Sequence, residues 1–183
     1  MKSETSAATG YTGTAKLLHW LVVALLLAQF AFAYMMPHIG RDTKPNMVIN
    51  LHFAFGVIIL AAVVVRLAWR FTHVEPTPLD RIPPWLVWSA RAVHFALYLL
   101  LIAIPILGWM NASWRGFDVS VFGLFSLPRL MATRAAGFAW TGDVHVALSW
   151  YVLLGFIAVH VAAALYHGLI RRDGVLARML PSG

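Results

Sequence analysis

Four long apolar runs dominate this 183-residue chain and restrict what it can fold into. They cover residues 14–36, 47–66, 92–110 and 144–170, and each is long enough to cross ~30 Å of hydrocarbon as a helix rising ~1.5 Å per residue. Hydrophobic residues make up 61% of the sequence and charged residues only 11%, whereas a soluble domain carries about 25% charged residues. We therefore predict an all-α transmembrane four-helix bundle that forms one domain over residues 1–183.

Proline and glycine mark the expected ends of these helices. Pro37 and Gly40 end the first run. Between the second and third runs, a cluster of prolines predicts a connection without helix, because proline lacks an N–H and restricts the residue before it; its members are Pro76, Pro78, Pro83 and Pro84. Pro105 lies inside the third run and is expected to kink it, which a membrane bundle tolerates.

The distribution of basic residues predicts the orientation. With four spans, nine Lys and Arg lie on the side of both termini and five on the other side, so the positive-inside rule places both termini in the cytoplasm. The triplet 31–33 resembles a signal-peptidase site, which would make the first run a cleaved leader. That run is longer than a signal core and contains His19 and Gln29, so we predict that it is retained as a span.

The formal charge of +7 and the absence of cysteine exclude several functions. The basic residues flank the apolar runs and form no stripe with interleaved aromatic residues, so the sequence does not predict nucleic-acid binding. Anionic lipid or cofactor carboxylates are the expected partners of this charge. Without cysteine the chain holds no disulfide, zinc–thiolate or iron–sulfur centre, and histidine is its remaining strong nitrogen ligand.

Histidines are concentrated inside the apolar runs. Ionisable groups in lipid are costly and usually mark a functional site, and six of the eight histidines fall in the predicted spans, namely His19, His52, His94, His145, His160 and His167. A single such residue often only forms a hydrogen bond with a neighbouring helix. Six in one small bundle indicate ligands for a metal or haem.

The depths of these histidines suggest two levels. His52 and His145 each lie within the first two turns of helices that start at the outer face, so they can clamp one planar macrocycle from opposite sides. His160 follows His145 by fifteen residues, or ~22 Å along a helix, which suits a second cofactor below the first. Its partner from the first or third helix is His19 or His94, and depth alone does not choose between them.

Other residues near these positions fit a cofactor. Gly56 is four residues after His52 on the same helical face, where a flat ring could lie against the backbone; packing of two helices through a small residue explains it as well. Arg66 and Arg70 at the inner end of the second helix could pair with haem propionates, or reach lipid phosphate instead.

The connection between the third and fourth spans, residues 111–143, is long and partly apolar. Its segment 119–125 reads Val-Ser-Val-Phe-Gly-Leu-Phe. We expect this segment to lie in the outer interface or to fold over the mouth of the bundle. A loop that rests on lipid without a function is the alternative.

The chain resembles the bacterial four-helix cytochrome b561 proteins from about Tyr11 to Pro181. The resemblance is carried by Leu-His-Trp at 18–20, Asn-Leu-His at 50–52, His94, Ile-Pro-Ile-Leu-Gly at 104–108, His145, the run 160–167 (HVAAALYH) and a tail over 171–181. It implies two b-type haems in a multi-pass protein of the bacterial inner membrane. It also implies that His52 and His145 ligate the outer haem and that His19 and His160 ligate the inner one. His94 and His167 then become candidates for contacts with quinone or propionates, with interhelical hydrogen bonding as the alternative.

The resemblance further implies an electron-transfer oxidoreductase that exchanges electrons with the quinone pool, with ubiquinone as partner. Some family members oxidise superoxide at the outer face, and a positive outer mouth would attract that anion; the candidates here are Arg115, Arg129 and Arg134. A redox protein is the other donor, in which case the chain would be the membrane anchor of a dehydrogenase or hydrogenase. A histidine-based metal or proton transporter is a weaker alternative, because no Asp or Glu lies within the predicted spans.

Overall fold

The computed structural model describes residues 10–40, 43–73, 76 and 82–180. It confirms four helices that are long and apolar enough to cross a membrane: α1 (Gly13–Met35), α2 (Met47–Thr72), α3 (Pro84–Arg115) and a fourth over Trp140–Arg171. The first two helices begin at side-chain caps, because the Thr12 hydroxyl accepts from the Ala15 N–H and the Asn46 carbonyl accepts from the Ile49 N–H.

The third helix begins eight residues before the predicted residue 92, and this corrects the expectation that Pro83 and Pro84 prevent helix. Pro83 is the N-cap of α3 and Pro84 its first residue. Proline is favoured there because the first N–H groups of a helix have no intrahelical partner to lose. The helix then continues through Pro105 to a left-handed Gly116. Of the other prolines in the cluster, Pro78 lies outside the described residues.

The fourth helix contains two π-helical turns along its length. It consists of α4 (Trp140–Ala147), a π-helical turn η1 (Leu148–Leu153), α5 (Leu154–Leu165) and a second π-helical turn η2 (Tyr166–Arg171). A π turn holds more residues than an α turn, so it rotates everything that follows about the helix axis. The angle between His145 and His160 therefore differs from the one expected for an uninterrupted α-helix.

The outer surfaces of the helices are apolar. Leu27 of α1 and Phe95 of α3 are each 70% exposed on the isolated chain. Only 6–28% of the residues in the most apolar window of each span are buried within the protein. Large apolar side chains exposed in this number are covered by lipid in a membrane protein.

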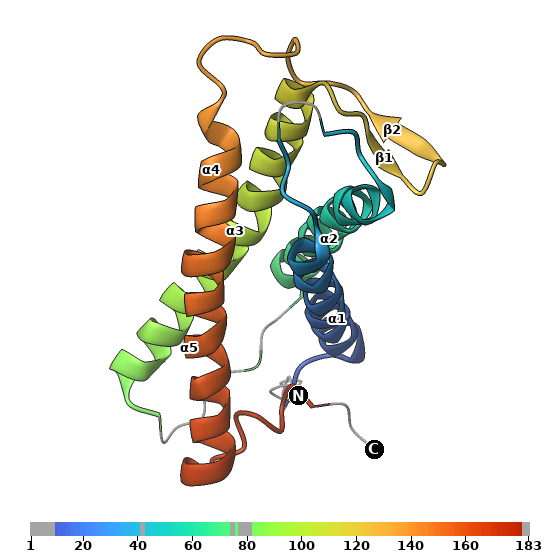
Figure 1. Ribbon diagram of the computed structural model, residues 1–183. Coiled ribbons are helices and arrows are strands. Elements are labelled where there is room, and N and C mark those ends of the chain that lie inside the picture. The colour runs from blue at the N-terminus through green and yellow to red at the C-terminus, as the bar shows by residue number, and fades with distance from the viewer. Residues whose placement is uncertain (1–9, 41–42, 74–75, 77–81, 181–183) are drawn as a thin grey trace.

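The four spans pack unevenly (Figure 1). α1 packs against α2, α2 against α3, and α3 against α4, η1 and α5. Among the described residues, no Cα atom of α1 or α2 lies within 8 Å of one in α4, η1 or α5. The fourth span is thus held away from α1 and α2 by α3, and side chains face each other across the space between them.

Two small apolar clusters join the spans. Val22, Ile59 and Val63 are buried where α1 meets α2. Leu100 and Ile104 of α3 pack with Leu153 of η1. Both clusters involve α2 or α3, which agrees with the central positions of these helices.

The connection from α3 to α4 contains a two-stranded antiparallel sheet of β1 (Val119–Val121) and β2 (Phe125–Leu127). β1 packs against α2. The chain after the hairpin folds back onto the end of α3, because the Trp109 and Trp114 indoles donate to the carbonyls of Pro128 and Ala135, 3.0 and 3.1 Å away. The connection therefore packs on the bundle rather than extending away from it.

At the opposite end of the bundle, the tail leads from the fourth span towards α1 (Figure 1). The Trp20 indole of α1 donates to the Met179 carbonyl at 3.0 Å. Near the start of the tail, Leu176 packs so closely on Gly168 that a Cβ at this glycine would lie 2.5 Å from the Leu176 Cδ2. The tail thus connects two helices whose backbones do not touch each other.

Candidate functional site

Two histidines face each other across the space between the helices, at the end that carries the hairpin, which is the end predicted to be outer. His52 lies on α2 and His145 on α4, and their ring centroids are 6.1 Å apart. A metal ion held by two imidazoles lies ~2 Å from each nitrogen, and each nitrogen lies ~1.1 Å from its ring centre, so the ring centres should be ~6.2 Å apart. The observed separation matches a pair of rings that share one metal ion.

The backbone of α3 holds the His145 ring in one orientation. The His145 Nδ1 lies 2.9 Å from the Ile104 carbonyl oxygen, and since a carbonyl only accepts, Nδ1 carries the proton. Nε2 is then left without a proton and can bind a metal. Gly108 provides the space for this ring, because a Cβ at that position would lie only 2.9 Å from the His145 Cε1.

Gln29 of α1 reaches the same region. Its amide nitrogen lies 3.3 Å from the His52 Nε2 and can only donate, so Nε2 is the acceptor and is also the unprotonated nitrogen. The Gln29 Oε1 and the His52 Nδ1 are both buried without a hydrogen-bond partner. Buried polar atoms are rarely left unpaired in a complete protein, so this region fits a further bound group.

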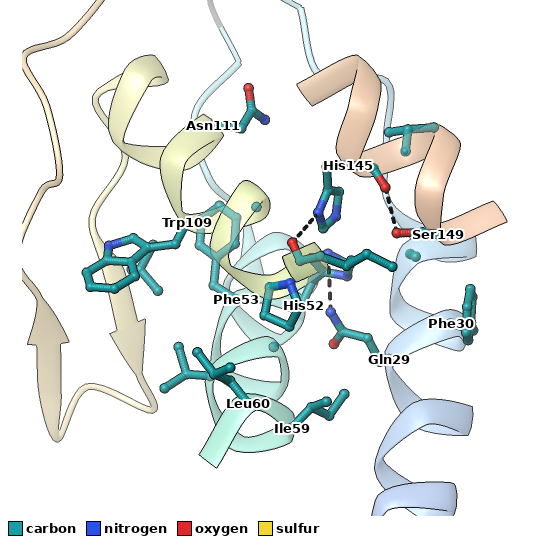
Figure 2. Close-up of a pocket in the computed structure, with 18 of the residues that line it drawn as sticks. Gln29, Phe30, His52, Phe53, Ile59, Leu60, Trp109, Asn111, His145 and Ser149 are labelled. Carbon is teal, nitrogen blue, oxygen red and sulfur yellow. Dashed lines mark hydrogen bonds between the residues drawn. The ribbon is translucent and has the colours of Figure 1, made fainter. Parts of the chain in front are cut away.

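A cavity surrounds this pair and draws on all four spans and the hairpin (Figure 2). Its walls are mainly apolar and aromatic and include Phe30, Phe53, Trp109 and Trp150. The polar side chains that line it are few: Gln29, His52, Asn111, His145 and Ser149. An apolar cavity with a histidine pair at its centre suits a flat, largely apolar cofactor with a central metal.

A second set of histidines lies at the inner level. The His19 and His160 ring centroids are 6.2 Å apart across the space between α1 and α5, and the His94 and His160 centroids are 5.3 Å apart. The first separation equals that of two rings sharing a metal, whereas the second is shorter. α3 and α5 are in backbone contact, so His94 lies beside His160 and not across the open space from it.

The predicted basic residues of the inner end lie next to this set. Arg66 donates from Nε to the Tyr98 hydroxyl at 3.0 Å and from Nη1 to the Ala15 carbonyl at 3.1 Å. The Arg70 guanidinium lies 5.6 Å from the centre of the Tyr98 ring. Gly56, by contrast, lines the outer cavity, where a Cβ would lie 3.6 Å from the Gln29 amide nitrogen.

His167 belongs to neither pair. Its Nδ1 lies 2.6 Å from the Asp173 Oδ2 in the tail, which also accepts from the Arg171 Nε at 3.2 Å. Burial alone would raise the pKa of the Asp173 carboxyl, but the hydrogen bonds from His167 and the Val175 N–H, with the charges of His167 and Arg171, lower it below its usual value. This pair holds the start of the tail against the end of the fourth span.

The three arginines proposed for the outer mouth are separated. Arg129 forms an ion pair with Asp118 at 2.9 Å, so its charge is compensated. Arg115 and Arg134 lie together, with their guanidinium carbons 5.9 and 4.6 Å from the centre of the Trp114 ring. The structure thus brings Arg115 and Arg134 into one basic region and leaves Arg129 outside it.

Several residues of the outer cavity were not predicted as site residues. Gln29 could have been found, since an amide inside an apolar span is a recognisable signal. Gly108, Ser149 and the Ile104 carbonyl could not, because a glycine, a serine or a backbone atom becomes part of a site only through its neighbours. Asn111, whose Oδ1 is buried without a hydrogen-bond partner, could not have been found from the sequence either.

Known proteins resemble this chain over most of its length. The family model of prokaryotic cytochrome b561 matches residues 10–182. The chain is 34% identical over 163 residues to "Cytochrome b561 homolog 2" of Escherichia coli (strain K12), which covers 88% of this chain and 86% of the relative. It is 30% identical over 170 residues to "Probable superoxide oxidase CybB" of Yersinia pestis, covering 90% and 92%. The chain is a membrane bundle with facing imidazoles, and the family model matches nearly its whole length. It therefore belongs to the prokaryotic cytochrome b561 family, whose members are membrane cytochromes with b-type haem.

Proposed function

We propose that this protein is a di-haem b-type cytochrome of the bacterial inner membrane that transfers electrons between a donor at the outer face and the quinone pool. The observation that carries the proposal is the pair of imidazole separations, 6.1 Å for His52–His145 and 6.2 Å for His19–His160. Two such pairs, at two levels of one bundle, would hold one haem each.

Bound b-type haem supplies one-electron chemistry, because its iron alternates between the ferrous and ferric states. Groups of the protein itself prepare the outer site to bind haem. The Ile104 carbonyl fixes the His145 tautomer, Gly108 leaves room for that ring, and the apolar walls exclude water. A haem held by two imidazoles would be suited to electron transfer rather than to oxygen binding.

At the inner level, we assign the ligand role to His19 and His160 and a positioning role to His94. His94 lies beside His160 and can restrict the orientation of that ring. Arg66 and Arg70 have the position and charge to pair with propionates. A quinone at this level would take two electrons and two protons, and His94 and His167 are the proposed polar residues near it.

The haem proposal is tested by spectroscopy of the purified protein. Reduced-minus-oxidised spectra and haem quantification should give b-type bands and two haems per chain. His145→Ala and His160→Ala should each reduce this to one haem, whereas His73→Ala, which alters a histidine stacked on Trp69 at the end of α2, should keep both. One haem per wild-type chain would contradict the di-haem assignment.

The inner ligand pair is tested by comparing His19→Ala with His94→Ala. We expect His19→Ala to lose the inner haem, and His94→Ala to keep both haems while shifting the midpoint potential of the inner one. Loss of the haem in His94→Ala, with retention in His19→Ala, would show that His94 is the ligand instead.

We propose superoxide as the outer donor, since the relative from Yersinia pestis carries the name "Probable superoxide oxidase CybB". Each superoxide would lose one electron and leave as O₂, so two of them supply the electrons for one quinone. The basic region of Arg115 and Arg134 would attract this anion. Superoxide should reduce the haems of the wild-type protein, and Arg134→Gln should slow this step more at low than at high salt, while Arg129→Gln should have little effect.

The alternative donor is a soluble redox subunit, with this chain as its membrane anchor. Failure of superoxide to reduce the haems, together with co-purification of a larger dehydrogenase or hydrogenase subunit, would favour that alternative. Both outcomes leave the haem ligation unaffected, so the donor and the cofactor assignments are tested separately.

A further inference from the structure

The hairpin of the outer connection has two faces of opposite polarity. Val119 is opposite Leu127, Val121 is opposite Phe125, and between these pairs Ser120 is opposite Ser126. Successive side chains of a strand point to opposite faces, so the apolar pairs share one face and the serine pair occupies the other. Such a sheet suits a boundary between an apolar phase and water.

The hairpin lies beside the outer turns of α2 (Figure 1). The Phe122 ring is 6.1 Å from Phe55, and the Phe117 ring is 6.3 Å from Phe53. Phe55 is eight residues, or ~12 Å of helix axis, beyond the start of α2. A shallow groove between the hairpin and α2 is lined by Ser120, Phe122 and Gly123 together with residues 45–47, 50 and 51. The hairpin therefore crosses the outer part of a membrane span and does not stand beyond its end.

The tip of the hairpin is apolar and exposed. Leu124 is 81% exposed, Phe122 55% and Phe125 53%. Residues 119–128 contain no charged side chain, and the ion pair of Asp118 with Arg129 comes directly before and after them. At the other end of the apolar face, Val119 and Leu127 line the outer cavity. One surface thus continues from the cavity wall to the lipid side of the bundle.

The backbone of the tip forms its hydrogen bonds internally. The Leu124 N–H donates to the Val121 carbonyl at 3.0 Å and the Gly123 N–H to the Ser120 hydroxyl at 3.2 Å. That hydroxyl in turn donates to the Phe125 carbonyl at 3.3 Å. Backbone groups that enter an apolar phase need such partners, because no water is available there.

We propose that this hairpin lies flat in the outer boundary of the membrane, with lipid acyl chains as its partner. Phe122, Leu124 and Phe125 enter the acyl region, while Ser120 and Ser126 face the head groups and water. The compensated pair Asp118–Arg129 lies at head-group level. In this position the hairpin closes the lipid side of the outer cavity and contributes to the membrane anchoring of the whole outer connection.

The absence of cysteine allows a clean test, since any single introduced cysteine can be spin-labelled alone. Leu124→Cys and Phe125→Cys report the apolar side, and the neighbouring Ser126→Cys is the matched control for the opposite face. Leu27→Cys, on an exposed part of α1, calibrates contact with lipid, and Ala136→Cys, in the exposed part of the connection, calibrates contact with water.

The measurement is the collision rate of each label with dissolved oxygen and with a water-soluble nickel chelate in lipid vesicles. Labels at Leu124 and Phe125 should resemble Leu27, and the nickel collision rate at Phe125 should be several-fold lower than at Ser126. If the labels at Leu124 and Phe125 instead resemble Ala136, the hairpin lies in water and the proposal is wrong.

A second copy of the chain is the competing partner for this tip. In that case, double electron–electron resonance between Leu124 labels would show a short distance that vanishes on dilution with unlabelled protein, and acyl-chain contact would be refuted. No haem is needed for either measurement, so failure here and failure of the proposed electron transfer are distinguishable.

Discussion

At the scale of single residues, the outer site depends on groups that contact the ligands and not only on the ligands themselves. The Ile104 carbonyl selects the tautomer of His145, and the missing side chain of Gly108 gives this ring its place. Such supporting groups orient metal ligands and often affect metal affinity strongly. Gln29, which contacts His52, completes the set from the other side of the cavity.

Gly108→Ala should reduce occupancy of the outer haem. The added methyl group would lie 2.9 Å from the His145 Cε1, so the ring must shift from its hydrogen bond with Ile104; overpacking of this kind costs about 1–3 kcal/mol. We expect haem content to fall from two towards one per chain, measured by pyridine haemochrome assay. Gly155→Ala is the control, because a Cβ there meets no atom within 4 Å, and equal haem loss in both variants would contradict the prediction.

At the scale of elements, the tail and the hairpin add contacts between helices at the two ends of the bundle. The tail runs from η2 to Trp20 on α1, two elements without close backbone contact. The hairpin connects the end of α3 with the side of α2. Both are short segments, and they lie at opposite ends of the bundle.

Asp173→Asn should loosen the tail. The lowered pKa of the Asp173 carboxyl means that its ionised form stabilises the folded state; this contribution is complete above the usual value of 3.8 and is lost as the pH falls through the lowered folded-state pKa. At neutral pH the free energy of unfolding of the variant should be about 1.5–3 kcal/mol lower than that of the wild-type protein, the range for hydrogen bonds to charged groups. On acidification below the usual carboxyl pKa, the difference from the wild-type protein should shrink.

The measurement is the unfolding free energy in detergent, followed across this acidic range. Asp118→Asn is the matched control, because its ion pair with Arg129 is largely exposed and exposed pairs contribute about 0–1 kcal/mol. An Asp173→Asn effect no larger than that of Asp118→Asn, or one independent of pH, would show that the tail does not depend on this carboxylate.

At the scale of the whole molecule, the bundle is open along one side of its interior. α3 separates the fourth span from α1 and α2, and the two facing histidine pairs lie in the resulting space. The space between the fourth span and the pair formed by α1 and α2 leaves room for cofactors held from both sides. The spacing of the helices is therefore the property of the whole molecule that the proposed haem function requires.

The orientation of the bundle is a prediction at this scale too. Nine basic residues lie on the side of the termini and five on the other side, so both termini should be cytoplasmic. Green fluorescent protein fused to the C-terminus should fluoresce, and alkaline phosphatase fused there should be inactive. Phosphatase inserted after Ala136, in the outer connection, should be active. The reverse pattern would show that both termini lie outside. The His52–His145 pair would then lie at the cytoplasmic face and the His19–His160 pair at the outer face.

The sequence alone determined the four spans, their approximate ends and the histidines that could serve as ligands, because hydrophobicity over some 20 residues and ionisable groups in lipid are strong local signals. It misplaced the start of α3, since proline breaks a helix within it but begins one at its first turn. The π turns and the proximity of His94 to His160 were decided only by the tertiary structure, as were the contacts of Gly108 and the Ile104 carbonyl with His145. These depend on how helices distant in sequence rotate and pack against one another, which no local pattern of residues records.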